Sequence, residues 1–217
     1  MNPSPVARRR IGALTVFLLA SSLSGSLIAQ GKPAPRKPAP APALLISAIA
    51  GQTLPILPLT YVVVDDSIHD AAMPAGRPAL LAWADSIVTE EILARAPEVT
   101  WLVGPELRRK TRAAPGMLPA PDRLGQAALR FENVKRLPDP LFSHLRTLVA
   151  LSNGRLVLVP ASVRLAAVEG GVRAETMFVL ADARSGAIIW RSSPVVTAPT
   201  ATAAIKATVD HILPDVR

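Results

Sequence analysis

The fold of this chain is decided by residues Gly154–Pro194, GRLVLVPASVRLAAVEGGVRAETMFVLADARSGAIIWRSSP. Strand-forming residues dominate this stretch, and apolar and polar positions partly alternate, as they do in half-buried strands. Two glycine-containing turns divide it, which predicts three consecutive strands. Pro160 lacks a main-chain donor inside the first strand, so we expect a bend, a bulge or an edge position there.

The first turn lies at Gly170-Gly171 and sets the pairing of the first two strands. If these glycines are the two loop residues, Val163 lies opposite Phe178 and Leu165 lies opposite Thr176. In this register every other residue of the second strand shares one face with the apolar residues of the first strand. The turn therefore predicts a hairpin with one consistently buried face.

The second turn, Asp182–Gly186, contains the residues that tight turns require. An aspartate at the start accepts hydrogen bonds from the amides of its own turn, and a glycine at the end adopts a positive φ. Ala187–Trp190 then returns as the third strand. Its apolar residues predict that the second face of the sheet is also partly buried.

An apolar run before this stretch, Leu54–Val64, predicts a further strand. The run is almost unbroken, which is typical of a strand covered on both faces. Pro55 and Pro58 cannot donate to a ladder, so the regular part of the strand is predicted at Leu59–Val64.

A helix and another strand follow this run. Pro78 fits the first turn of a helix because its missing amide would be unsatisfied there, and one apolar side continues to about Arg95. Asp85 falls largely on the opposite, polar side. The next strand is Val99–Val103, which completes a β-α-β unit with two parallel strands.

Residues 104–139 form the longest connection of the chain and are rich in proline and glycine. Within this loop, Glu106–Arg112 predicts a helical turn and Gln126–Phe131 predicts a short helix. A connection of this length is usually either functional or mobile. Two further helices are predicted, Pro140–Ser152 before the three strands and Thr200–Leu213 after them.

The order of these elements predicts an α/β fold of the two-layer α+β kind. The order is strand, helix, strand, helix, three strands and helix, and we expect a mixed sheet of about five strands with the helices packed on it. Residues 54–217 are predicted to form this single domain. Residues 30–53, rich in proline and alanine, are predicted to be an extended spacer.

The N-terminal residues 1–29 are typical of a secretory signal peptide. Arg8–Arg10 supply the positive start, Ile11–Ile28 is apolar and uncharged, and cleavage is expected near Ala29-Gln30. The protein is therefore predicted to be periplasmic or secreted. The alternative is a retained signal anchor, because the apolar segment is close to the minimum length of a membrane span. In that case alone we expect contact with a membrane.

The net charge of +8 is concentrated at the N-terminus. Residues 38–217 hold 18 basic and 16 acidic side chains, so the folded part is close to neutral and does not predict nucleic-acid binding. The dense basic run Arg108–Arg112 is interpreted as solvated surface. The absence of cysteine excludes disulfides, thiolate metal sites and a lipidated cysteine.

One cluster combines histidine with carboxylates: Asp65, Asp66, His69 and Asp70. It follows a predicted strand, where α/β folds place ligands, but its spacing matches neither a helical zinc pair nor a calcium loop. A solvated loop is therefore favoured. We predict no catalytic, metal-binding or cofactor-binding residue and no cofactor.

The other histidines and the tryptophans also favour structural roles. His144 and His211 lie on predicted helices that contain no carboxylate four residues away from either histidine. Tryptophans are more often core residues than binding platforms, and this interpretation applies to Trp83, Trp101 and Trp190.

Three short motifs give the chain a family resemblance. Ile56–Leu59 resembles a V-L-P-F strand, Leu148–Val159 a helix end followed by a strand, and Asp182–Trp190 a D-x-x-T-G-x-I-x-W hairpin. In these motifs the chain is similar to the envelope domains of the TolB N-terminal, CsgG and LpoB families. It departs from the CsgG and LpoB lipoproteins in having no cysteine to acylate. The resemblance implies an exported, non-catalytic domain that binds proteins.

Three functional hypotheses follow. The first is an exported accessory subunit of a bacterial cell-envelope complex, which binds envelope proteins through a sheet edge or the 104–139 loop. The second is a hydrolase or metal-dependent enzyme that uses the Asp65–Asp70 loop. The third is a signal-anchored membrane accessory protein.

Overall fold

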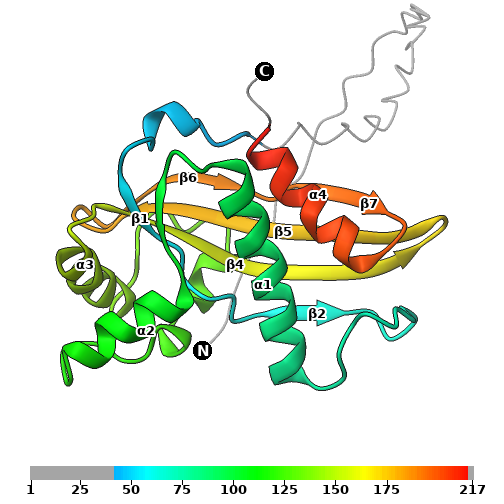
Figure 1. Cartoon of the computed structure of the whole chain (residues 1–217), viewed down its shortest axis with the longest axis horizontal. Helices are drawn as coiled ribbons and strands as arrows, with labels where there is room; N and C mark the ends of the chain where they lie inside the picture. Colours follow the sequence, from blue (N-terminus) through cyan, green and yellow to red (C-terminus); the bar gives the residue numbers. More distant parts are fainter. Residues whose placement is uncertain (1–41, 215–217) are drawn as a thin grey trace, which may run out of the picture. The chain divides into compact units, whose positions relative to one another are not determined.

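The computed structural model describes residues 42–214, so the predicted signal peptide and much of the predicted spacer lie outside the described residues. The described part is an α+β domain with a mixed five-stranded sheet and a parallel two-stranded sheet (Figure 1), which confirms the predicted fold class. No helix within this part combines the length and apolar character that crossing a bilayer requires. The strands are β1 (Thr53–Pro55), β2 (Val62–Val64), β3 (Thr100–Leu102), β4 (Leu156–Val168), β5 (Gly171–Asp182), β6 (Ala187–Ser192) and β7 (Val195–Ala198). The helices are α1 (Arg77–Arg95), α2 (Gly104–Ala113), α3 (Leu141–Ser152) and α4 (Ala201–Ile212), with 3-10 turns at Ile46–Ala48, Pro121–Arg123 and Ala127–Arg130.

The long hairpin of β4 and β5 forms the centre of the sheet. Val163 pairs with Thr176 and Leu165 pairs with Ala174, so the predicted register is wrong by two residues. Because side chains alternate along a strand, a shift of two leaves each residue on the face that the sequence predicted. The ladder also shifts between Pro160 and Ser162, which confirms the irregularity expected at the proline.

The alternation of β5 builds two hydrophobic cores. Val172, Ala174, Phe178 and Leu180 belong to the first core, where α1 and α4 cover the sheet. Met177, Val179 and Ala181 face the second core, which α3 and part of residues 104–139 cover. The predicted apolar face is therefore confirmed, and the second face is covered at one end as well.

Residues 104–139, which the sequence predicted as a loop, contain a helix and two 3-10 turns. Their first part is α2, a helix of ten residues where the sequence predicted a turn, and the short helix expected at Gln126–Phe131 is a 3-10 turn. The segment packs on the second core through leucines that are at most 9% exposed, namely Leu107, Leu118, Leu124, Leu129 and Leu137.

The parallel β-α-β unit has a different first strand from the predicted one. β3 pairs in parallel with β1 and not with Leu59–Val64, whereas β2 pairs in parallel with β4. A bridge between Ile56 and Leu158 places the two short strands one after the other alongside β4. The prolines at 55 and 58 divide this strand, since neither can donate to a ladder.

Two further features lie outside the sequence prediction. Leu44, Ile46 and Ile49 pack in the first core, so the packed part of the chain extends to the N-terminal side of residue 54. β7 is a strand that the sequence did not predict, and it pairs with the first residues of β5.

Gly171 tests the observed register directly. Its φ is 149°, and a Cβ there would lie 2.3 Å from the Ala198 carbonyl oxygen, whereas at Gly170 (φ 84°) a Cβ would meet no atom within 4 Å. We predict that Gly170→Ala costs about 1–2 kcal/mol from the left-handed backbone alone. Gly171→Ala adds about 1–3 kcal/mol of overlap. Urea unfolding of the two variants measures the difference, and equal losses would contradict the pairing of β5 with β7.

Candidate functional site

The Asp65–Asp70 loop is held by its own carboxylates. Asp65 accepts hydrogen bonds from the amide (3.0 Å) and hydroxyl (2.7 Å) of Ser67, and these bonds lower its pKa. Asp70 accepts from the Ala72 amide and from the Ala201 amide at the start of α4, at 2.9 and 3.1 Å. The loop therefore caps a helix far away in the sequence. Within residues 42–214 no three His, Asp or Glu side chains gather as a metal site.

The remaining sequence candidates occupy structural or surface positions. His144 lies on α3 and His211 is exposed on the last turn of α4. Arg108 pairs with Asp122 at 3.0 Å, and the Lys110 ammonium donates to the Leu151 carbonyl. Trp83 and Trp190 are half-buried against the first core, and Trp101 is buried with its indole N–H donating to the Ala96 carbonyl.

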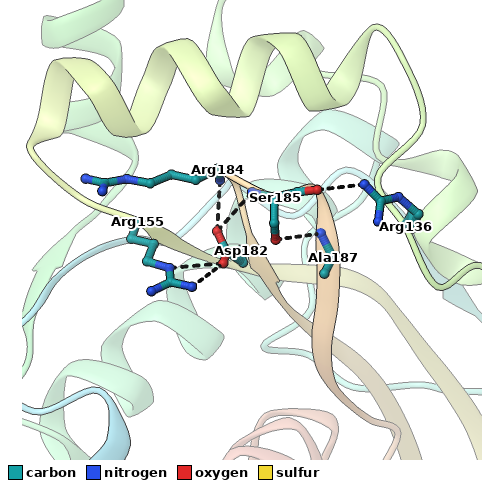
Figure 2. Close-up of polar contacts among 6 residues, drawn as sticks. All are labelled: Arg136, Arg155, Asp182, Arg184, Ser185 and Ala187. Carbon is teal, nitrogen blue, oxygen red and sulfur yellow. Dashed lines mark hydrogen bonds and ion pairs between the residues drawn. The ribbon is translucent and has the colours of Figure 1, made fainter.

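The turn Asp182–Gly186 has the predicted structure, which Figure 2 shows. One Asp182 oxygen accepts from the amides of Arg184 (2.9 Å) and Ser185 (3.3 Å). The other oxygen binds the Arg155 guanidinium at 2.7 Å. These bonds lower the pKa of Asp182 to about 2, with the Arg155 hydrogen bond contributing most. Arg155, which directly precedes β4, thus helps to fix the geometry of the turn.

The break between β1 and β2 borders a cavity of about 700 Å³. Asp85 on α1 lies here and not on a solvated side, because its carboxylate accepts the Leu59 amide at 2.8 Å. Burial raises its pKa. On the other side, the Gln126 side chain donates to the Pro58 carbonyl at 3.1 Å. These polar side chains satisfy main-chain groups that lost their ladder partners, so the sequence had no local signal for their roles.

A different surface of the sheet exposes apolar side chains next to charged ones. At the end of the sheet that residues 104–139 leave uncovered, one row of side chains crosses four strands on the second face: Val63, Arg164, Glu175 and Val195. We call these four residues the open row. Val63 is 43% exposed and Val195 is 57% exposed. Val63 lies on β2, which pairs with β4, and Val195 lies on β7, which pairs with β5.

The open row ends at a strand edge with which no other strand of residues 42–214 pairs. β2 is the outermost strand of the five-stranded sheet on this side (Figure 1). The amide of Val163 donates to the Tyr61 carbonyl and the amide of Asp65 donates to the Leu165 carbonyl. In a parallel ladder this register turns Val63 towards β4, and turns the main-chain groups of Val62 and Val64 away from it. Those two residues therefore present donors and acceptors to a further strand.

The comparisons with known proteins give distant structural similarities. No family model matches the chain, and no curated protein matches its sequence. The C-terminal domain of LpoB from Escherichia coli is 15% identical and has a TM-score of 0.43, over 70% of this chain and 93% of that chain. The PelC dodecamer from Paraburkholderia phytofirmans is 14% identical with a TM-score of 0.41, over 82% and 96%. The NMR structure of E. coli LpoB is 15% identical with a TM-score of 0.38, over 91% of each chain. LpoB is one of the families named from the sequence motifs, and the resemblance to TolB and CsgG stays a prediction.

The lowered pKa of Asp182 predicts a defined dependence of stability on pH. Its carboxylate has a pKa of about 2 in the folded chain against 3.8 ordinarily, so its stabilisation is complete above about pH 4 and is lost as the pH falls through about 2. We predict that Asp182→Asn lowers the free energy of unfolding by about 1–2 kcal/mol at pH 7 and flattens its dependence on pH between 4 and 2. Urea unfolding measures both effects. Asp66→Asn, at an exposed carboxylate, serves as the control, and an equal effect there would contradict the account.

Proposed function

We propose that this chain is an exported, non-catalytic domain that binds other proteins as an accessory subunit of a bacterial cell-envelope complex. The observation that carries the proposal is the open row together with the free edge of β2. Folded proteins usually protect such edges with charges, prolines or covering segments. An edge strand of three valines, with Val63 exposed, is better suited to receiving a partner.

The roles of the loop carboxylates favour binding over catalysis. The enzyme hypothesis located its chemistry at Asp65–Asp70, and there Asp65 and Asp70 each accept main-chain amides. An acid engaged in this way fixes a turn or a helix end and is poorly placed to take a proton from a substrate. Replacing Asp66 or His69 with alanine is accordingly expected to leave partner binding unchanged.

The proposed location rests on residues 1–29. Their positive start, apolar stretch and small residues before Gln30 are those of a secretory signal. The family resemblance of the three motifs implies the same compartment. The signal-anchored alternative differs only in whether this segment stays on the mature chain.

The state of the N-terminus is directly measurable. We predict that the protein recovered from the cell envelope begins at about Gln30, since the segment before it fits a cleaved signal. Intact mass spectrometry of the recovered protein measures this. A chain that retains residues 1–29 would support the anchored alternative.

Position-specific crosslinking tests the binding surface. We predict that a photoreactive residue at position 63, introduced into the full chain in its native envelope, captures a defined protein partner. Leu93 on α1 is a matched control, because it is 39% exposed against 43% for Val63. Equal capture from both positions, or capture from position 93 alone, would contradict the proposal.

A further inference from the structure

The open row lies beside a cluster of arginines around Tyr61. The Arg130 guanidinium lies 4.0 Å from the centre of the Tyr61 ring, and its Nε donates to the Ala161 carbonyl at 3.3 Å. A guanidinium over an aromatic face is held in place without losing its charge. Arg130 is therefore a fixed positive group immediately before the start of β2.

Arg130 bonds to β4 at Ala161, three residues before Arg164. Burial lowers the pKa of Arg130, and the positive charges of Arg77 and Arg164 lower it further. Arg164 is a member of the open row and pairs with Val63 of the edge strand. Arg130 and Arg164 thus form one basic patch beside Tyr61 and Val63, and we define the basic patch as these two arginines.

No ion pair within the described part of the chain neutralises the basic patch. Within residues 42–214, neither of its two arginines forms an ion pair, although Glu175 lies directly across the ladder from Arg164. Like charges that gather without counter-charges destabilise the free protein and attract an anionic partner. The patch therefore has the sign of charge that an acidic ligand requires.

The position of the patch selects the form of that ligand. A strand added to β2 would bond to the outward main-chain groups of Val62 and Val64, and every second side chain would lie on the face that carries Val63 and Arg164. The intervening side chains would lie with Val62 and Val64, which pack against the first core. Acidic residues suit the first set of positions and β-branched apolar residues suit the second.

We propose that the free edge of β2 accepts an extended segment of a partner protein in which acidic and apolar residues alternate. The segment continues the sheet through its main chain, and its carboxylates meet the basic patch. This proposal rests on the proposed function and names the chemistry of its partner. A lipid or polysaccharide surface has no strand-like donors and acceptors to match the edge, so the observations favour a peptide.

Titration of the purified mature chain with a labelled peptide of alternating glutamate and valine tests the proposal. We expect saturable binding that weakens with salt, and no binding of the lysine–valine counterpart. Arg164→Glu is expected to weaken binding at least tenfold. Arg146→Glu makes the same charge change at an exposed position on α3, away from β2, and is expected to leave binding within about twofold.

A second variant separates strand addition from simple charge attraction. Val62→Pro removes one outward main-chain donor without changing any charge, and proline is tolerated at sheet edges. We expect at least a tenfold loss of peptide binding, with the circular dichroism spectrum unchanged. Peptide binding equal to that of the unaltered chain would overturn the strand-addition proposal.

The remaining outcomes also decide the proposal. Binding to vesicles of anionic phospholipid that depends on Arg164, without binding of the peptide, would overturn it in favour of a membrane surface. Crosslinking through position 63 without binding of the acidic peptide would overturn the acidic partner and leave the proposed function standing. Absence of both would remove the proposed function as well.

Discussion

The structure depends on burying both faces of the central strand β5. Its alternate residues enter two separate cores, with Phe178 fully buried in the first and Val179 fully buried in the second. A sheet covered on one face buries apolar area in one core only, whereas this sheet buries apolar area in two. The helices α1 and α4 cover one face, and α3 with residues 104–139 covers part of the other, so β4 and β5 are the rigid frame on which every other segment is placed.

The incomplete cover of the second face gives the protein its exposed surface. Residues 104–139 are fastened by side-chain bonds to the main chain, including the Arg191 guanidinium, which donates to the carbonyls of Leu129 (2.5 Å) and Val134 (3.1 Å). At Arg130 this cover stops beside Tyr61. Beyond it, β2 pairs with β4, and Val62 and Val64 pack against the first core. A binding surface on a rigid frame is preorganised, which lowers the entropy lost on association.

Local signals of the sequence predicted local structure well. The turn Asp182–Gly186, the helix that begins near Pro78 and the buried face of β5 all follow from residues close together in the chain. The register of the first hairpin did not, because two adjacent glycines allow two loops, and the choice is made by Ala198 approaching Gly171 from another strand. The sequence likewise predicted the wrong surroundings for Asp85 and did not predict the capping role of Asp70. Each carboxylate bonds to a main-chain amide that is remote in the sequence. The arginine cluster around Tyr61 joins residues from three separate segments, and no spacing in the sequence indicates it.

The central claim is that the outer edge of β2 is free in the unbound protein. Hydrogen exchange of individual amides, followed by NMR on the purified protein, measures this most directly. The account predicts that the amides of Val62 and Val64 exchange rapidly, whereas the amide of Val63, which faces β4, is protected. Equal protection of all three would contradict it, because the edge would then already be covered.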